Sequence, residues 1–499
     1  MRFDRRRVAV AVAAAVAACA VGPLALHGST STAAPSRHVA APTWTDVAPI
    51  FATKCAGCHM SGGIAPFSLT SARSAKAHAG AILTMTQLGM MPPWPPGRDS
   101  PPFVGSERRI LTAAEKSTIA RWVQGGARIG KGETIKPART GSSAPGTDLS
   151  LVPARSYTPH ATGGGFDDYH CSLLEPHLKQ DVFVTSAQIQ PGQADLVHHV
   201  ILFEAAGANA DEARSLNRAS GGKGWTCFGG PGLGDAHPTA AAVSSDRLGA
   251  PQWISAWVPG RSATDAPAGT GVLVHTGAAV VMQVHYNLIH GAHADRSRAV
   301  LRTVPAKGSS LTPLDTILLP APVELPCPQG VDGAACSRDQ AITDETRKYG
   351  REAAFIPYGL LFLCGKTLAD YPRDVGDGHN VRTSCDRAVN RPIRIYGVAG
   401  HMHLRGVDIK VELDPGTSQA RTLLHIPRWH FHWQDAYYLR NPIDAGPGDT
   451  VRVTCRFDNS RAAQPVIGGS RLPPRYVVWG EGTTDEMCLG LLQVANRGG

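Results

Sequence analysis

The spacing of hydrophobic positions changes once along this 499-residue chain. Between about residues 43 and 130, apolar residues recur three and four positions apart, which predicts two amphipathic helices, over 46–55 and 111–123. Thr112 and Glu115 have the spacing of a capping box at the start of the second helix. From about residue 147 onwards, short apolar runs are separated by Gly and Pro, which predicts strands over 197–203, 279–287, 393–403 and 451–457.

These patterns predict a multidomain fold class, in which a small all-α domain precedes two all-β, jelly-roll-like sandwiches. We expect the all-α domain at 43–130, a linker rich in Gly, Ser, Pro and Lys at 131–147, and the sandwiches at 148–310 and 311–499. The chain length suits about three domains. Charged residues make up 18% and hydrophobic residues 42%, which is typical of globular domains.

Residues 1–42 have the features of an export segment. A basic start is followed by an apolar run at 8–26 and by small residues at 29–35. Three outcomes stay open: a cleaved signal peptide, a membrane anchor that tethers the protein, or a lipoprotein modified at Cys19. In each case we expect an exported protein, either periplasmic or membrane-anchored and facing the periplasm.

The formal charge of +9 does not indicate a nucleic-acid partner. Residues 1–42 hold five arginines against one aspartate and so account for +4 of it, which leaves +5 for the remaining chain. No Lys/Arg run in the sequence is long enough to follow a phosphate backbone. We therefore discount nucleic acid.

The cysteines predict disulfides in the β region. Of the 11 cysteines, Cys19 lies in the export segment and two belong to the motif described next. The remaining eight form an even set, which indicates disulfides in an oxidising compartment: Cys171, Cys227, Cys327, Cys336, Cys364, Cys385, Cys455 and Cys488. Eight cysteines allow about a hundred pairings, so spacing alone does not choose among them.

A C-x-x-C-H motif at residues 55–59 predicts covalently bound haem c. Cys55 and Cys58 have the spacing of thiols that add to the two haem vinyl groups, and His59 then ligates the iron. The alternative is a chance motif that holds a disulfide or zinc, but the export segment and the helical context favour haem. Such a haem needs an electron donor as a partner.

Met91 is the candidate for the sixth iron ligand. It precedes Pro92-Pro93-Trp94, and consecutive prolines can hold a thioether rigidly over the iron. Methionine is more often core filler, and three others compete: Met60, Met85 and Met90. The run 90–95 and the helix that closes the unit resemble those of small cytochrome c domains fused to periplasmic enzymes.

Four segments of the β region carry candidate metal ligands. On a strand, His401 and His403 project from one face, which suits chelation of one ion. His198 and His199 are adjacent, so they can share an ion only if the strand bulges there. His285 lies on the polar face of its strand, and Met487 lies in the segment 484–488. His430 and His432 form a second His-x-His pair. Spacing alone does not favour His401 and His403 over this pair as metal ligands.

These segments, in this order, resemble the copper type II, ascorbate-dependent monooxygenases, the family of dopamine β-hydroxylase and peptidylglycine α-hydroxylating monooxygenase. The resemblance covers about residues 148–497 and includes the flanking segments 168–171, 257–260 and 447–455. It implies one copper on His198, His199 and His285. It implies a second, catalytic copper on His401, His403 and Met487, and so favours this His-x-His pair over His430 and His432.

The resemblance also implies the fold, chemistry and cofactors. Two nine-stranded sandwiches would face each other across a solvent-filled cleft, and Cys455 would pair with Cys488. The two copper ions would hydroxylate a C–H bond of a small-molecule substrate with O2, with ascorbate or the haem as reductant. Because the family's carboxylate-binding positions hold Ala399, Leu489 and Leu491 or Gly490, a peptidylglycine substrate is not expected. The alternatives are a non-catalytic copper-binding or electron-transfer protein, and a different oxygen or nitrogen-oxide reaction at the methionine-ligated copper.

Overall fold

The computed structural model describes residues 40–61, 65–137, 142, 144–161, 166–234, 252–258, 261, 263–289, 291–372, 374–467 and 469–497. Residues from 42 onwards group into one unit, which is described here by itself. The expected export segment, with Cys19, lies outside the described residues. Pro259 and Gly260 of the segment 257–260 lie outside them too.

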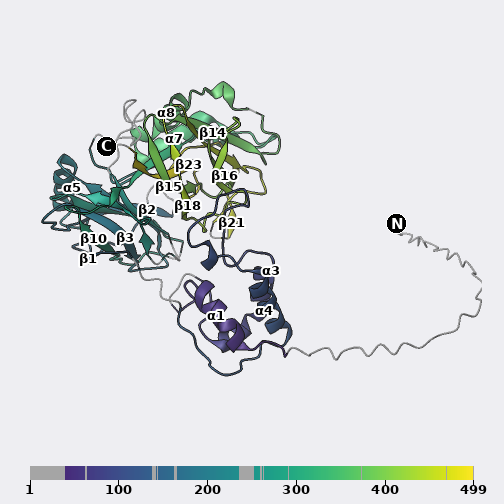
Figure 1. The fold of residues 1–499 in the computed structure, drawn as a ribbon. Coiled ribbons are helices and arrows are strands. Elements are labelled where there is room, and N and C mark those ends of the chain that lie inside the picture. Colours follow the sequence, from purple (N-terminus) through teal and green to yellow (C-terminus); the bar gives the residue numbers. More distant parts are fainter. Residues whose placement is uncertain are drawn as a thin grey trace, which may run out of the picture. The chain divides into compact units, whose positions relative to one another are not determined.

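A small helical unit occupies the N-terminal part of the described chain, drawn in purple and dark blue in Figure 1. Its helices are α1 Trp44–Lys54, α2 Ala72–Ala77, α3 Ala79–Gln87 and α4 Ala113–Gln124, and the 3-10 turn η1 spans Ser106–Arg108. Trp44, Phe51 and Trp122 pack together, with ring centroids 5.5–6.3 Å apart. The predicted capping box of Thr112 and Glu115 is present at the start of α4. Both predicted helices are confirmed, as α1 and α4.

The first sandwich consists of two sheets, drawn in teal in Figure 1. One has the order β1-β10-β3-β8-β11 with β7 beside β3, and the other the order β5-β2-β9-β4-β6. The strands are β1 Thr147–Leu151, β2 Asp167–Leu174, β3 Val182–Gln190, β4 Val197–Ala205, β5 Trp225–Thr226, β6 Trp253–Trp257, β7 Thr264–Asp265, β8 Thr270–Val274, β9 Ala279–Asn287, β10 Arg298–Pro305 and β11 Thr312–Pro313. Val184, Leu202, Val284 and Leu301 pack between the sheets.

The second sandwich has two four-stranded sheets, in the orders β12-β23-β15-β18 and β14-β19-β16-β17. Their strands are β12 Asp315–Pro320, β14 Val381–Ala388, β15 Ile393–His401, β16 Gly406–Leu413, β17 Arg421–Ile426, β18 Ala436–Ala445, β19 Thr450–Phe457 and β23 Leu489–Asn496. Two short pairs accompany them: β13 Glu324–Leu325 with β22 Val477–Val478, and β20 Val466–Ile467 with β21 Ser470–Arg471. In the described residues the sheets therefore hold six, five, four and four strands, not nine per sandwich.

The predicted strands agree with β4, β9, β15 and β19 to within two residues at each end. In the described part of the β region, the all-β expectation missed three helices: α5 Ala208–Ala219, α7 Arg338–Tyr349 and α8 Ile356–Leu363. Three 3-10 turns accompany α7 and α8: η2 Ala334–Cys336, η3 Arg351–Ala354 and η4 Leu368–Asp370. The buried residues of α5 are the small side chains Ala210 and Ala213.

Four disulfides join the eight cysteines of the β region. The family-based pair Cys455–Cys488 is confirmed, and it links β19 to the residue that follows Met487. The structure resolves the other three pairs, which the sequence left open: Cys171–Cys227, Cys327–Cys336 and Cys364–Cys385. Such bonds are typical of proteins that fold in an oxidising compartment.

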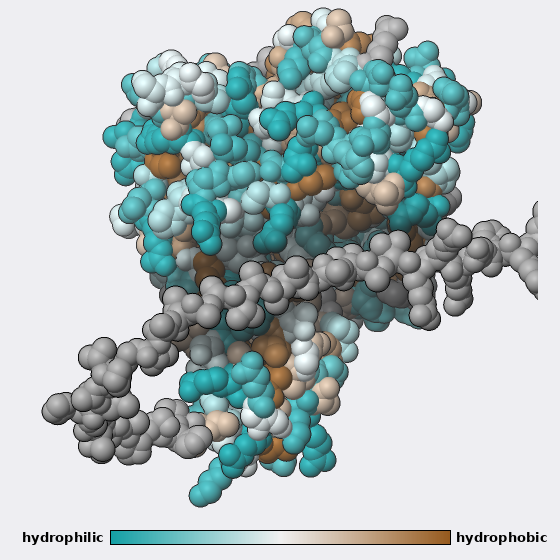
Figure 2. Space-filling model, turned by 90° about the vertical axis from the view of Figure 1, so that its right-hand side faces the viewer, coloured by the Kyte–Doolittle hydropathy of each residue, from teal (hydrophilic) through white to brown (hydrophobic). Residues whose placement is uncertain are grey.

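The face of the described chain shown in Figure 2 is mostly hydrophilic, and its hydrophobic residues are confined to small patches and recesses. None of the helices in the described part of the chain combines the length and the apolar character that a bilayer crossing needs.

Candidate metal centre

Three histidines from two neighbouring strands of the first sandwich form a cluster. β4 and β9 pair in a register that places His199 opposite His285. The register shifts between Val197 and His199, so the predicted bulge is present, and it lets adjacent histidines share one cluster. Nδ1 of His199 lies 3.3 Å from Nδ1 of His198 and 3.4 Å from Nδ1 of His285.

These distances fit three imidazoles around one metal ion. Two nitrogens that are each about 2.0 Å from an ion, at an angle of about 110°, lie about 3.3 Å apart. The three histidines are the described residues whose His, Cys, Asp or Glu donor atoms gather within 4.8 Å of one another. Imidazole nitrogen suits copper among several transition metals.

The partners of His285 fix which of its nitrogens faces the cluster. Its Nε2 lies 2.9 Å from a carboxylate oxygen of Asp167, so Nδ1 is the nitrogen left for an ion. The ring of Tyr169 stacks on His285 at 4.2 Å and limits its rotation. A carboxylate on the outer nitrogen is the usual support of a metal-binding histidine.

The second predicted group comes from β15 and the segment before β23. His401 is the last residue of β15, whereas His403 lies beyond the strand. His403 therefore does not project from the strand face that carries His401, contrary to the prediction. Their rings are still neighbours, with centroids 5.0 Å apart. Met487 is buried just before β23, the strand that pairs with β15 at His401.

A buried carboxylate, rather than strand pairing, holds the backbone at His403. Glu486 accepts hydrogen bonds from the backbone N–H of His403 at 2.9 Å, of Arg405 at 2.7 Å and of Met487 at 3.2 Å. The indole N–H of Trp429 donates to the carbonyl of His403 at 3.1 Å. Glu486 thus joins the segment that carries His403 to the one that carries Met487.

The side chains of this second group fit a metal as well. Nδ1 of His401 lies 2.6 Å from the amide oxygen of Gln434, which leaves Nε2 for an ion. Nδ1 of His403 is buried and has no hydrogen-bond partner among the described residues. An unsatisfied buried nitrogen is costly unless something binds it. Two imidazoles beside a thioether form a soft donor set that suits Cu(I).

Burial keeps these imidazoles neutral. It lowers the pKa of His401 to about 4 and the pKa of His403 to about 3. It also lowers the pKa of His198 and of His199 well below the usual value, and the neighbouring His285 adds to this effect. A neutral imidazole keeps the lone pair that binds a metal.

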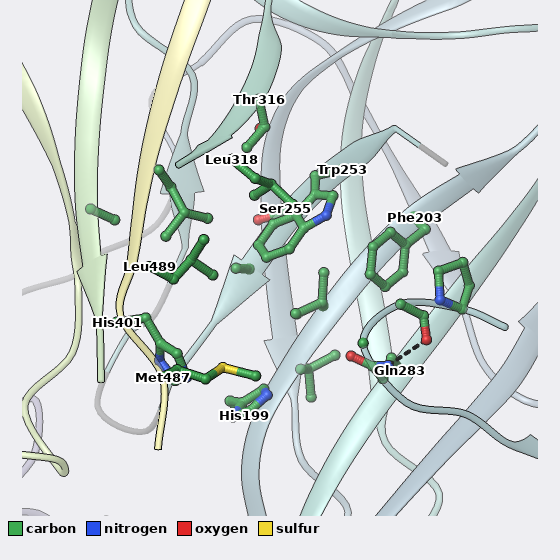
Figure 3. Close-up of a pocket in the computed structure, with 18 of the residues that line it drawn as sticks. His199, Phe203, Trp253, Ser255, Gln283, Thr316, Leu318, His401, Met487 and Leu489 are labelled. Atoms are coloured by element: carbon green, nitrogen blue, oxygen red, sulfur yellow. Dashed lines mark hydrogen bonds between the residues drawn. The ribbon is translucent and has the colours of Figure 1, made fainter. Parts of the chain in front are cut away.

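The two groups lie next to each other. The rings of His199 and His401 are 6.4 Å apart, and Phe431 of the second sandwich stacks on His198 at 4.7 Å. Figure 3 shows His199, His401 and Met487 gathered at one end of a pocket of about 640 Å³. We expected the two sandwiches to face each other across a solvent-filled cleft. At the two histidine groups their side chains instead lie close enough to contact one another.

Hydrogen bonds hold the two sandwiches together at this point. Thr483 donates to Asp167 through its hydroxyl at 2.7 Å and through its backbone N–H at 3.0 Å. The hydroxyl of Tyr169 donates to the carbonyl of Glu481 at 2.6 Å. Asp167 and Tyr169, which support His285, are thus also the residues that contact the second sandwich.

The competing His-x-His pair lies in the turn between β17 and β18. His430 and His432 are exposed, and their rings are 5.6 Å apart. His432 approaches His198 to 6.4 Å. Its neighbours Phe431 and Gln434 contact the histidines of both groups, so the segment 429–434 supports the candidate centre.

The C-x-x-C-H motif follows α1. Cys55 and Cys58 are not among the cysteines joined by the four disulfides, and burial raises the pKa of the Cys55 thiol to about 12. Nδ1 of His59 lies 3.0 Å from the carbonyl of Phe67, which leaves Nε2 for a ligand. Met60 and Met90 are exposed, whereas Met85 and Met91 are partly buried, and ligation by Met91 stays a prediction.

Sequence reasoning missed four residues that support the centre: Asp167, Gln434, Phe431 and Glu486. Three of them stood in or beside recognised motifs: Asp167 precedes the segment 168–171, Glu486 lies within 484–488, and Phe431 lies between His430 and His432. Gln434 had no such signal. Gln283, which shares a strand face with His285, donates to the carbonyl of Gly230 at 2.6 Å and holds that loop (Figure 3).

Comparison with known proteins supports the copper monooxygenase resemblance. Residues 377–493 match the family described as copper type II ascorbate-dependent monooxygenase, C-terminal domain. The chain is 23% identical over 335 residues to DBH-like monooxygenase protein 1 of Gallus gallus, and 23% identical over 332 residues to the protein of that name in Homo sapiens. Each alignment covers 65% of this chain and 44% of the relative, so the chain matches less than half of their length.

Among solved structures, allantoicase from Saccharomyces cerevisiae aligns with 68% of this chain and 83% of its own. The sequences are 12% identical and the TM-score is 0.16, which is too low to relate the two folds. The family match lies in the second sandwich, and the four disulfides are typical of proteins that fold outside a reducing compartment.

Proposed function

We propose that this protein is an exported, copper-dependent monooxygenase that hydroxylates a C–H bond of a small molecule with O2 and receives electrons through a fused c-type haem. The single observation that carries the proposal is the convergence of five imidazoles and a thioether in two adjacent groups at one pocket. A structural histidine cluster would need neither the thioether nor the pocket.

The two donor sets suggest different roles. Copper held by these side chains would supply the one-electron redox chemistry that O2 activation requires. His198, His199 and His285 form the all-nitrogen group, which suits electron storage. His401, His403 and Met487 form the softer group, which faces the pocket and suits the site of oxygen chemistry.

The remaining residues orient these donors. Asp167 and Gln434 each bind the outer nitrogen of one histidine and so select the nitrogen that faces the centre. Glu486 fixes the backbone on both sides of the second group. Phe431 stacks on His198 of one group and lies 5.9 Å from the ring of His403 of the other.

Two features support the haem. Nδ1 of His59 donates to the carbonyl of Phe67 at 3.0 Å, as an iron-ligating histidine does with a backbone carbonyl. The raised pKa of the Cys55 thiol argues against a reactive dithiol pair, which needs a lowered pKa. In this proposal Cys55 and Cys58 bind haem c, His59 ligates the iron and Met91 completes its coordination.

The helical unit also contacts the second sandwich near His401. Arg109 lies 3.4 Å from a carboxylate oxygen of Asp435, the residue after Gln434. Trp94 packs against Tyr437 at 5.6 Å, and the N–H of Val104 donates to the carbonyl of Tyr438 at 2.8 Å. A haem in this unit would have a short path to His401 through the segment 434–438, while ascorbate or a periplasmic carrier reduces the haem.

Metal content and O2 uptake test the proposal. The enzyme should bind two copper ions and one haem, and should consume O2 when it is reduced in the presence of a substrate. The variant Met487→Ile should lose O2 consumption yet keep the haem and the three-histidine copper. A protein that binds one copper and consumes no O2 would be an electron carrier or copper-binding protein, and full turnover by Met487→Ile would place the oxygen chemistry elsewhere.

A further inference from the structure

The pocket beside the candidate centre lies between one sheet of each sandwich. Its walls include residues of β4 and β6 in the first sandwich and of β12, β15 and β23 in the second, and β3, the loop 226–234 and α8 add further lining residues. Figure 3 shows His199, His401 and Met487 at one end, with Phe203, Trp253 and Leu318 along the walls that lead away from them. A molecule in this space would therefore lie directly against the second histidine group.

The wall from the first sandwich is apolar and aromatic. Along β4, the face that carries His199 continues into Ile201 and Phe203. The neighbouring strand β6 adds Trp253 and Trp257, and Ser255 is its polar contribution. These side chains are large, and their only polar atoms are uncharged.

The wall from the second sandwich is aliphatic. β15 and β23 pair so that Ala399 is opposite Leu491 and His401 is opposite Leu489. β12 continues this surface, because Leu318 is the partner of Leu491. Phe355, which is 68% exposed, also lines the pocket and gives its opening an apolar rim.

The charged side chains that line the pocket are already engaged. Arg261 pairs with Asp435, and Glu345 pairs with Lys348 at 3.0 Å. Glu212 accepts a hydrogen bond from the N–H of Gly234, and Asp315 lies 4.0 Å from Arg391. Arg261, Asp435, Glu345 and Asp315 thus each have an oppositely charged partner, and Glu212, which is exposed, has a backbone donor.

Glu481 is a further acidic residue of the pocket wall. Its carboxylate accepts hydrogen bonds from Gly229 and Trp479, and burial together with Asp485 raises its pKa to about 7. Such a carboxyl is only partly ionised near neutral pH and is a poor partner for an ammonium group. Burying an unpaired charge against the rest of this wall would be costly.

We propose that this pocket binds an uncharged, mainly hydrophobic small molecule, aromatic or alicyclic in size and shape, and presents one of its C–H bonds to the group of His401, His403 and Met487. The presentation of a C–H bond rests on the proposed function, whereas the binding of the molecule does not. Ser255 and Thr316 offer hydroxyl groups that suit one neutral polar substituent.

Three naphthalene derivatives test the charge preference: 1-naphthalenemethanol, 1-naphthoate and 1-naphthylmethylammonium. Isothermal titration of the full chain, stripped of copper so that no ligand can bind metal directly, should show the alcohol binding at least about tenfold more tightly than either ion. Equal or tighter binding of an ion, or no binding of the alcohol, would overturn the proposal.

Leu491→Arg should reverse the preference in favour of 1-naphthoate, because it places an unpaired cation in the pocket wall. Val466→Arg is the matched control, since Val466 is 54% exposed and is not among the residues that line the pocket. If Leu491→Arg does not fold, as judged by circular dichroism, Leu318→Arg makes the same test from the neighbouring strand. An unchanged preference in the folded variant would overturn the proposal.

These results separate the two proposals. Tight binding of the alcohol without copper-dependent O2 consumption would keep the pocket assignment and reject the monooxygenase. O2 consumption by a protein that prefers an ionic ligand would keep the monooxygenase and reject the pocket assignment.

Discussion

Asp167 connects His285 of the first sandwich to Thr483 of the second. One carboxylate oxygen lies 2.9 Å from Nε2 of His285 and 2.7 Å from the hydroxyl of Thr483, and the other accepts the backbone N–H of Thr483 at 3.0 Å. The same carboxylate therefore orients a candidate ligand and helps to hold the sandwiches together at the centre.

Asp167→Asn should weaken copper binding at the three-histidine group by about 10- to 100-fold, the usual effect of losing such a partner. The amide still fills the space, so the fold should persist. Copper titration of the wild type and the variant measures the change. Asp195→Asn makes the same substitution at an exposed position and is the control, which should bind copper as tightly as the wild type. Unchanged affinity in Asp167→Asn would mean that His285 does not depend on this contact.

Glu486→Gln should impair the second group and spare the first. The amide offers one acceptor oxygen where the carboxylate accepts three backbone N–H groups, so the free energy of unfolding should fall by about 1–3 kcal/mol. Urea denaturation gives that value, and Cu(I) titration should show one weakened site. Glu107→Gln, which alters a surface ion pair with Arg440, should change neither. Equal weakening of both copper sites would contradict the local role of Glu486.

The disulfide Cys455–Cys488 should stabilise the fold more than Cys327–Cys336 does. It closes a loop with a sequence separation of 33 residues, against 9 for the other, and the entropy removed from the unfolded chain grows with loop length. Replacing both cysteines of the longer loop by serine should cost about 2–4 kcal/mol. Thermal unfolding of the two double variants should rank them in this order, and the reverse order would contradict it.

Arg109→Ala should slow electron transfer from the haem to copper severalfold. The ion pair with Asp435 is partly exposed, and such pairs contribute at most about 1 kcal/mol, so the expected effect on docking is small. Stopped-flow reduction of the oxidised protein would follow haem and copper separately. Arg108→Ala, which removes the exposed neighbouring charge, is the control, and equal rates in both variants would exclude this contact from the path.

Local signals in the sequence predicted much of the fold and of the ligand set. The alternation along 279–287 predicted a strand with Gln283 and His285 on one face, and Met282, Val284 and Tyr286 are indeed core residues. The adjacency of His198 and His199 required a bulge, which is present in β4. Each of these inferences depends on residues that are neighbours in one element.

Features that depend on packing between elements were not predictable. His403 lies beyond its strand, and a carboxylate 83 residues away holds it in place. The close approach of His199 and His401 depends on how the two sandwiches meet, which no spacing within either one reveals. The turn with His430 and His432 resembled a second ligand pair, but its neighbours Phe431 and Gln434 are the residues that contact the centre.

In the proposed enzyme, two copper sites share one pocket. Anomalous X-ray scattering at the copper edge from crystals of the copper-loaded protein measures this directly. We predict two copper peaks, one bounded by His198, His199 and His285 and one by His401, His403 and Met487. A single peak, or a peak at His430 and His432 in place of the second, would contradict the account.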